Sequence, residues 1–535
     1  MKVRPFLLSL TTALVFLQFI VFVPERVLAL SGTNPTENNQ LELPKTAKFL
    51  PQNSSVSLHW TIKEEKLPQY LQSTEPLEKK ISEAQKISRE LIENLFALAG
   101  LNFYSDLSEW IGPEISFAFF EANEDHQDFD WVMAISSRNV SESKNFLQSF
   151  WQKQRLDGID LNLSEYRGVT LISGNQTSTV NSYQPVSTAL VSDNLIVIAS
   201  KKSRLEDSLS ISQLPGLNQL GNQTLKQSIN HLNNGLGILT ISPKSLYSLF
   251  SLPLKISERD DFNGFVASFQ ANESYIDING FLEFKNPIKK QTPQNNENIS
   301  THKIAGTSEE VVAFFNSPLD LLSKSSNDPL SQLIGPILVA KLQSLEGVTA
   351  KAIITFNEGP LIWLKEAKGW VIGTKKGSPP ISLIDKLLTK ENYKRSELLI
   401  NNKIFQVWSK LVTEHVQDGD KLKTKIGAIL LQDSDINWWG ENLFALQQKE
   451  QTESRLKQEE SGEFHPEGMN MSAMQISLNA IQAQEQLNQW YPWQLLKVIG
   501  SASITPNIQG MEISINTDSE RNPNSINLNT KLDIS

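Results

Sequence analysis

An internal repetition constrains the fold of this chain more than any other feature of its sequence. Residues 131–134 (Trp-Val-Met-Ala) have a counterpart in residues 370–373 (Trp-Val-Ile-Gly), and residues 189–193 have a counterpart in residues 428–433. Both pairs are 239 positions apart. Two separated landmarks with one spacing indicate a duplicated structural unit. The alternative is that short apolar segments resemble one another by composition alone.

A third match lies further along each copy. Residues 265–269 and 275–278 resemble residues 500–504 and 511–515, about 235 positions later. A chain of 535 residues has room for two units, because one hydrophobic core stops growing at roughly 250–300 residues. We therefore expect two domains of similar construction.

Hydrophobic periodicity predicts the elements of the first copy. The predicted strands cover residues 55–60, 115–121, 131–135, 169–172 and 187–200, and the predicted helices cover residues 77–98 and 142–153. Ser192, Asp193 and Asn194 tolerate positive φ, so they predict a tight turn that makes the last strand a hairpin. These patterns favour the α+β class, with tandem duplicated antiparallel sheets and helices packed on one face.

The chain divides into five segments by this interpretation. They are a signal peptide or N-terminal anchor (1–29), a flexible leader (30–49), the first α+β repeat (50–285), a linker (286–304) and the second α+β repeat (305–535). The leader and the linker are rich in Pro, Asn and Gln and have no apolar period, which is typical of connecting segments.

The N-terminus has the pattern of a secretory signal. Lys2 and Arg4 precede an apolar run at residues 6–23, and Val27 and Ala29 place small residues before a cleavage point. The run of 18 residues is also close to the shortest membrane-spanning helix, so an uncleaved anchor that associates the protein with a membrane is the alternative. Either interpretation predicts an exported protein.

The composition excludes several classes of chemistry. The chain has no cysteine, so it has no disulfides, thiolate metal sites or thiol nucleophile. Its formal charge of −10, without a basic stripe that we recognise in the sequence, repels phosphate backbones and anionic lipid and argues against nucleic acid as a partner. The glycine-rich motifs that bind nucleotide phosphates are missing from the sequence, and we expect no cofactor.

The layout is familiar from one family. A duplicated, strand-rich body behind an exported N-terminus, with a Trp-Ile-Gly-Pro-Glu turn at residues 110–114, resembles a cyanobacterial family known only as a domain of unknown function. Members of that family carry a Trp-Leu-Gly-Asp/Glu motif, and Pro113 departs from it. The resemblance implies a cyanobacterial source and a location in the periplasm or the thylakoid lumen. It supplies no catalytic residues.

Two local patterns imitate the motifs of penicillin-recognising serine enzymes. Ser141 and Lys144 have Ser-x-x-Lys spacing, and residues 192–194 read Ser-Asp-Asn. The third motif of those enzymes, Lys-Thr/Ser-Gly, is missing from the sequence. We interpret Ser141 as the N-cap of the following helix and residues 192–194 as the hairpin turn, and we predict no catalytic residue.

The metal candidate is a group of soft ligands. His465, Met469 and Met471 lie close together in the sequence, and thioethers select Cu(I). The alternative interpretation places Met469 and Met471 in an ordinary loop and Met474 on the inner face of the next helix.

Other polar residues have ordinary interpretations. The acidic residues at 124–130 predict a solvated connection between strands. His59, His231, His302 and His415 are isolated in the sequence, so we interpret them as surface or core residues.

The leading functional hypothesis is a non-enzymatic exported protein that binds a protein partner or a hydrophobic molecule, in an assembly or carrier role. Aromatic clusters at residues 438–439 and 490–493 could line a groove, and the alternative is that they fill a core. The rival hypothesis is an exported hydrolase whose site is assembled from residues distant in sequence. Serine, histidine and acid groups that converge in one pocket would indicate the hydrolase.

Overall fold

The protein is described from a computed structural model. The described residues are 41–61, 101, 106–107, 110–120, 130–176, 186–232, 235, 237–248, 253–271, 275–288, 311–322, 327–344, 348–366, 369–416, 419–433, 436–449, 473–488, 508–517 and 523–534. They form two compact units. The first comprises the described residues up to 286 with short C-terminal additions, and the second comprises those within 287–485 and 509–527.

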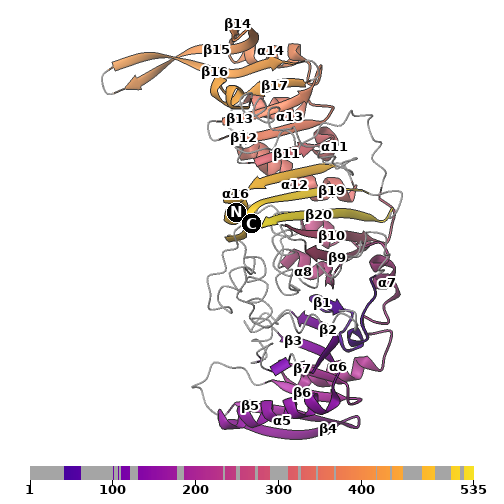
Figure 1. Ribbon diagram of the computed structural model, residues 1–535. Helices are drawn as coiled ribbons and strands as arrows, with labels where there is room; N and C mark the ends of the chain where they lie inside the picture. The colour runs from indigo at the N-terminus through magenta and orange to yellow at the C-terminus, as the bar shows by residue number, and fades with distance from the viewer. Residues whose placement is uncertain are drawn as a thin grey trace, which may run out of the picture. The chain divides into compact units, whose positions relative to one another are not determined.

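The protein is an α+β protein, and the described residues include twenty strands that pair with their neighbours in antiparallel fashion (Figure 1). The strands of the first copy are β1 (Val56–Thr61), β2 (Ile111–Phe120), β3 (Asp130–Ser137), β4 (Ile159–Tyr166), β5 (Val169–Gln176), β6 (Ser187–Val191), β7 (Leu195–Ala199), β8 (Gly237–Ile241), β9 (Phe262–Ala271) and β10 (Tyr275–Phe284). Those of the second copy are β11 (Val311–Phe315), β12 (Leu361–Glu366), β13 (Gly369–Lys375), β14 (Lys394–Ile400), β15 (Lys403–Val416), β16 (Gly419–Gln432), β17 (Ile436–Gly440), β18 (Met474–Asn479), β19 (Ile508–Asn516) and β20 (Ser525–Ile534).

Strand order confirms the duplication. In the first copy the neighbours run β4-β5-β6-β7-β3-β2-β1-β8-β9, and in the second they run β14-β15-β16-β17-β13-β12-β11-β18-β19. Every strand of the first order therefore has its counterpart ten strands later, although the order is not the order along the chain. The same irregular strand order in both copies is much stronger evidence of duplication than the similarity between short apolar segments of the sequence.

The third sequence match is wrong in register. Residues 511–515 lie in β19, which corresponds to β9 by strand order, whereas we had matched them to residues 275–278 of β10. Apolar and polar residues alternate in the same way in the two strands that end each copy, so the sequence pattern alone does not distinguish one strand from the other. Residues 500–504 and the predicted helix at 77–98 lie outside the described residues.

Helices lie on both faces of the sheet in the first unit. In this unit the helices are η2 (Lys45–Phe49), α5 (Val140–Leu156), α6 (Lys202–Ser212), α7 (Gln223–Ile229), α8 (Pro243–Ser248) and α9 (Leu254–Ser257). Trp151 of α5 donates from Nε1 to Thr188 Oγ1 on one face at 2.8 Å. The next residue, Ala189, points to the opposite face and packs in a core with Phe49 of η2 and Leu205 of α6.

The second unit repeats this two-sided packing. Its helices are α11 (Pro318–Leu322), α12 (Pro329–Ser344), α13 (Val348–Thr355), α14 (Ile381–Lys390) and α16 (Ala480–Asn488). Trp408 donates from Nε1 to Asp385 of α14 at 2.7 Å, while Val407 packs on the other face with Leu446 of a short helix at 443–449. We expected helices on one face, but central strands that are buried on both faces need two covering layers. The continuous apolar run of β7 already carried that signal.

The predicted leader extends too far into the fold. Residues 45–49 form η2, in which Thr46, Ala47 and Phe49 are buried. Ser208 of α6 donates to the carbonyl of Phe49 at 2.6 Å, which ties η2 to the helix layer. The apolar side chains of Ala47 and Phe49 are buried although the stretch around them is mainly polar. Residues 1–40 and most of the predicted linker lie outside the described residues.

Residues 111–114, which we expected in a turn, form the irregular start of β2 where it pairs with β3. Trp110 is buried and accepts a backbone hydrogen bond from Arg138. The pairing of β2 with β3 shifts between Ile111 and Ile115, and Ser136 Oγ accepts from the backbone N–H of Glu114 at 2.8 Å. A Cβ on Gly112 would lie 2.5 Å from Ser136 Oγ, so only glycine fits there without rearrangement.

Among the described residues, no helix is long and apolar enough to cross a membrane.

Replacement of Gly373 tests the packing of the second unit. A Cβ at Gly373 would lie 2.7 Å from a ring atom of the buried Trp438. We expect Gly373→Ala to lower the free energy of unfolding by about 1–3 kcal/mol, because overpacking displaces a rigid neighbour. Urea unfolding monitored by tryptophan fluorescence measures it. Gly216→Ala is the control, since nothing lies within 4 Å of its Cβ; equal effects of the two variants would contradict this packing.

Candidate functional site

A buried polar cluster lies in the first unit around His59. His59 is on β1 and pairs with Ser116 on the neighbouring β2, while Gln219 lies in the connection between α6 and α7. His59 Nδ1 lies 2.9 Å from Ser116 Oγ, and His59 Nε2 lies 2.6 Å from Gln219 Oε1. All three side chains are buried. We call this group, with Thr46 and Ser57, the His59 cluster.

The hydrogen bonds assign the protons of the cluster. Gln219 Nε2 donates to Ser57 Oγ at 2.7 Å, so its Oε1 faces His59 and accepts from Nε2–H. His59 Nδ1 is then the acceptor of the Ser116 hydroxyl, and Ser116 Oγ in turn accepts from Thr46 Oγ1 at 2.7 Å. Burial lowers the pKa of His59 to about 4, against a smaller raising effect of the Gln219 hydrogen bond. The imidazole is therefore neutral at physiological pH.

The second unit builds the same positions from apolar residues. Ser116 pairs with Ala134 of β3, whose counterpart in the repetition is Gly373 of β13. Gly373 pairs with Ile362, and Ile362 pairs with Phe314, so Phe314 and Ile362 stand where His59 and Ser116 stand in the first copy. Ile362 is a buried member of the second unit's core. The fold does not need a polar cluster here, and burying one costs free energy.

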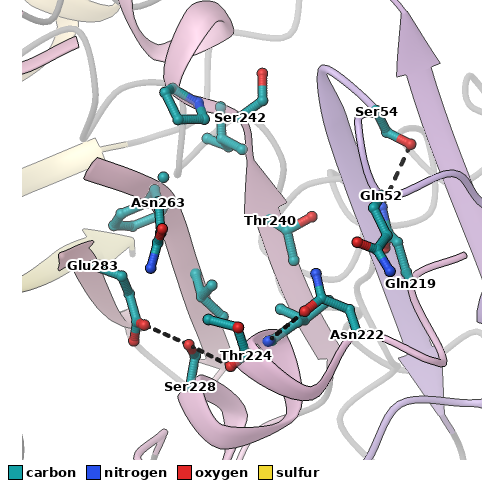
Figure 2. A pocket seen from close by; sticks show the side chains of 16 residues that line it. Gln52, Ser54, Gln219, Asn222, Thr224, Ser228, Thr240, Ser242, Asn263 and Glu283 are labelled. Atoms are coloured by element: carbon teal, nitrogen blue, oxygen red, sulfur yellow. Dashed lines mark hydrogen bonds between the residues drawn. The ribbon is translucent and has the colours of Figure 1, made fainter. Parts of the chain in front are cut away.

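A cleft opens beside the His59 cluster (Figure 2). Its volume is about 290 Å3, and Ser54 and Gln219 belong to its wall. Ten of its sixteen lining residues carry polar side chains, namely Gln52, Ser54, Gln219, Asn222, Thr224, Ser228, Thr240, Ser242, Asn263 and Glu283. Gln219 is thus the residue through which the cleft touches the cluster, since its Oε1 binds His59.

The cleft is hydrogen-bonding and weakly acidic. Glu283, at the end of β10, is the one charged residue among the described residues that line it, and it accepts from Ser228 Oγ of α7 at 2.5 Å. Hydroxyl and amide groups of Thr240, Asn263 and Asn222 project from β8, β9 and the start of α7 (Figure 2). Such a wall can form many hydrogen bonds with a ligand. Its described lining residues include no positively charged side chain that could pair with an anionic ligand.

The Ser116–His59 contact does not form a hydrolytic site. Ser116 Oγ and His59 are enclosed in the core, and neither residue lines the cleft. The third member is the Gln219 amide, which cannot stabilise an imidazolium as a carboxylate does. A histidine with a pKa of about 4 is a weak base at neutral pH. This contact therefore gives the hydrolase hypothesis no support.

The cluster was missed because it looks ordinary in one copy. In β1, Ser57 and His59 alternate with Val56, Leu58 and Trp60, which resembles a strand with one solvated face. Both faces are in fact buried. Comparison with the apolar β11 of the second copy was the available signal, because it shows that these positions are core positions.

The predicted metal candidate cannot be placed. His465, Met469 and Met471 lie outside the described residues. Within the described part of the chain, no group of three or more His, Cys, Asp or Glu side chains is arranged to hold a metal ion. Met474 begins strand β18, and not the inner face of a helix as we had interpreted it; α16 follows from Ala480.

The structure describes one of the two aromatic clusters, at residues 438–439. Trp438 and Trp439 of β17 are buried, and Trp439 stacks on Trp408 with ring centroids 6.0 Å apart. They are buried in the core of the second unit, as the alternative interpretation predicted. Residues 490–493 lie outside the described residues.

The two patterns that imitate penicillin-recognising enzymes contribute an exposed ion pair, and neither contains the N-cap of α5. Asn139, and not Ser141, caps α5, because its side chain accepts from the backbone N–H groups of Ser141 and Glu142. Asp193 in the hairpin turn has φ of 64°, as the turn prediction requires. Lys144 pairs with Asp193 at 2.7 Å, but their side chains are 51% and 66% exposed. The two patterns are neighbours because this exposed ion pair joins α5 to the β6–β7 hairpin.

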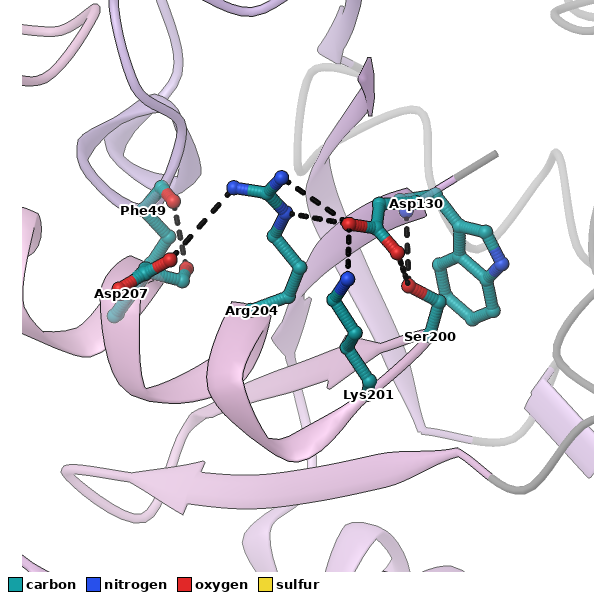
Figure 3. A network of polar contacts seen from close by, with 8 residues as sticks. Phe49, Asp130, Ser200, Lys201, Arg204 and Asp207 are labelled. Atoms are coloured by element: carbon teal, nitrogen blue, oxygen red, sulfur yellow. Dashed lines mark hydrogen bonds and ion pairs between the residues drawn. The ribbon is translucent and has the colours of Figure 1, made fainter. Parts of the chain in front are cut away.

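Asp130 anchors α6 at the start of β3 (Figure 3). Its Oδ2 lies 2.6 Å from Lys201 Nζ and 3.1 Å from a terminal nitrogen of Arg204, and its side chain is 20% exposed. The Arg204 guanidinium also lies over the ring of Phe120, 4.3 Å from the centroid. Asp130, which we had assigned to a solvated connection, is therefore structural; residues 124–129 lie outside the described residues.

The two ion pairs allow a matched comparison of burial. We expect Asp130→Asn to lower the free energy of unfolding by about 1–2 kcal/mol, because it removes charge-assisted hydrogen bonds from a mostly buried carboxylate. Asp193→Asn, at the exposed pair with Lys144, should change it by about 0–0.5 kcal/mol. Urea denaturation of both variants checks this. A larger loss at Asp193 would refute the anchoring role of Asp130.

The His59 cluster predicts a specific pH dependence. The folded pKa of about 4 lies below the ordinary value of 6.5, so unfolding takes up a proton at His59 between these pH values. Stability should fall as the pH is lowered through that window, by up to about 3 kcal/mol from this group. His59→Gln should remove this component. Urea titrations of both proteins between these pH values measure it, and parallel pH profiles would disprove the depressed pKa.

Comparison with known proteins assigns the family. Two crystal forms of TP0453, forms III and I, are similar in structure at 11% identity and a TM-score of 0.25, over 48% and 46% of this chain and 83% and 82% of theirs. No curated protein matches the chain by sequence. The model of the family described as protein of unknown function DUF3352 matches residues 10–531. The chain therefore belongs to the DUF3352 family.

Proposed function

We propose that this protein is a non-enzymatic binding protein whose first unit takes a small, uncharged, hydroxyl-rich or amide-rich molecule into the cleft beside the His59 cluster. The observation that supports it is the polar lining of the cleft, ten residues of sixteen. A ligand there would exchange hydrogen bonds with side chains from β8, β9, β10 and α7. A volume of about 290 Å3 suits a molecule of the size of one or two sugar rings.

The lining favours a polar ligand over the hydrophobic molecule of our leading hypothesis. Leu225, Ile241 and Phe265 contribute apolar surface, but hydroxyl and amide groups surround them. A hydrophobic ligand would leave those groups without hydrogen bonds, at a cost of about 1–3 kcal/mol for each buried one. Glu283 disfavours an anionic ligand by repulsion, so neutral molecules fit this cleft best.

The His59 cluster orients the wall of this cleft. The Gln219 side chain is held by His59 through Oε1 and by Ser57 through Nε2, so its position is set before a ligand arrives. Pre-organised polar groups bind more tightly because less conformational freedom is lost on binding. This explains why the first unit keeps polar residues where the second unit has Phe314 and Ile362.

The proposed setting is outside the cytoplasm. The charged start, the apolar run at 6–23 and the small residues before position 30 support export to the periplasm or the thylakoid lumen, with residues 6–23 as a membrane anchor if the signal stays uncleaved. A binding protein there would serve a carrier or assembly role, as the leading hypothesis holds.

Thermal shift and titration calorimetry test the ligand class. We expect glucose or maltose to stabilise the full chain and to bind with a measurable heat, while phosphate and citrate at equal ionic strength do neither. Thr240→Val with Asn263→Leu should weaken the binding at least tenfold, because both remove hydrogen-bonding groups from the wall.

The control carries the same changes away from the cleft. Thr170→Val with Asn162→Leu replaces two exposed residues of the β4–β5 hairpin and should leave the binding unchanged. Tight binding of citrate or phosphate to the cleft, or equal binding of sugars to all three proteins, would overturn the proposal.

A further inference from the structure

The long hairpin of β15 and β16 ends in a two-stranded arm. Pairing of the strands shifts between Trp408 and Ser409, where Gly427 is an extra residue on β16. We define the arm as residues 409–416 and 419–426, beyond this irregularity. Figure 1 shows the hairpin extending past the neighbouring strands of its unit. At the base of the arm Lys410 Nζ donates to the carbonyl of Glu391 at 3.0 Å, and beyond it most side chains of the arm are exposed.

One face of the arm is apolar. Cross-strand partners share a face, and the pairs on this face are Ser409 with Ile426, Leu411 with Thr424 and Thr413 with Leu422. Leu411 is 70% exposed, Leu422 is 74% exposed and Ile426 is 38% exposed, so three apolar side chains share one exposed face. The face has no charged side chain except at its tip, where His415 is opposite Asp420.

The opposite face is basic. It pairs Lys410 with Lys425, Val412 with Lys423 and Glu414 with Lys421, so four lysines lie on one side of a short ribbon. Strand alternation turns the stretch Lys421-Leu422-Lys423-Thr424-Lys425 into two different faces. These four lysines form a basic stripe that is not apparent from the sequence, because apolar residues alternate with them.

The acidic residues of the arm are matched within it. Glu414 lies 3.3 Å from Lys423, and Asp420 contacts His415. With Asp418 in the connection between the strands, residues 409–426 carry four lysines against three carboxylates, which leaves a small positive charge in a chain of formal charge −10. A positive, projecting element on an acidic protein concentrates its attraction for anions at one place.

We propose that the arm binds the surface of an anionic lipid bilayer, with Leu411 and Leu422 inserted among the acyl chains and the lysines on the phosphate groups. The separation of apolar and lysine faces matches the interface of a membrane, where apolar side chains enter the bilayer and lysine stems extend to the headgroups. Protein interfaces are depleted in lysine and enriched in aromatic residues and arginine, and the arm has neither of these. A nucleic acid would satisfy the lysines but leave both leucines in water.

Co-sedimentation of the full chain with vesicles tests the charge requirement. We expect stronger, salt-sensitive binding to vesicles of equal parts phosphatidylcholine and phosphatidylglycerol than to phosphatidylcholine alone. Lys421→Gln with Lys425→Gln should weaken the salt-sensitive binding about 30-fold, since each lysine near an anionic surface contributes about fivefold. The control, Lys153→Gln with Lys255→Gln, removes the same charge from exposed positions of the first unit and should have little effect.

A fluorescent label tests which face enters the bilayer. Because the chain has no cysteine, Leu422→Cys and Lys423→Cys each allow one environment-sensitive dye to be attached to neighbouring residues on opposite faces. We expect a blue shift with anionic vesicles at position 422 and none at 423 or at Leu156→Cys in the first unit. Equal shifts at 422 and 423, or tight salt-sensitive binding of an acidic peptide or duplex DNA in place of the vesicles, would overturn the proposal.

Discussion

The burial of the central strands on both faces is the constraint on which this fold depends. β3 and β7, like β13 and β17 in the second copy, carry apolar residues on both sides, so each unit needs a helix layer above and below its sheet. α5 and α6 supply these layers in the first unit, and α14 and the helix at 443–449 supply them in the second. Every residue near the centre of these sheets is therefore a core residue, whichever face it points to.

Because central positions of the sheet are core positions on either face, the polar side chains of the His59 cluster need an explanation. A histidine, two serines and a glutamine are buried in the first unit, while the positions on β11 and β12 that match His59 and Ser116 carry Phe314 and Ile362. The fold is stable with apolar residues there, as the second copy shows. A fully hydrogen-bonded polar cluster that the fold does not require, with one member in the wall of a polar cleft, is best explained by the cleft.

Much of the architecture was predictable from the sequence, and the reasons differ between elements. The spacing of residues 131–134 and 370–373 predicted the duplication, and turn residues at 192–194 predicted the β6–β7 hairpin, because both signals are visible in the sequence without any knowledge of contacts. The two-sided helix packing and the burial of η2 depend on contacts between residues far apart in the chain, which periodicity does not report. The cluster was hidden for the same reason: His59 meets Gln219 across 160 positions.

The central claim is that the His59 cluster and the cleft form one functional unit. Nitrogen NMR of the His59 imidazole tests it most directly, because the two ring nitrogens report separately on Ser116 and on Gln219. The account predicts a neutral imidazole protonated at Nε2. It also predicts that the Nε2 resonance shifts when a saccharide saturates the cleft and forms a hydrogen bond with Gln219. An Nε2 resonance that does not move at saturation would show that the cluster serves the core alone.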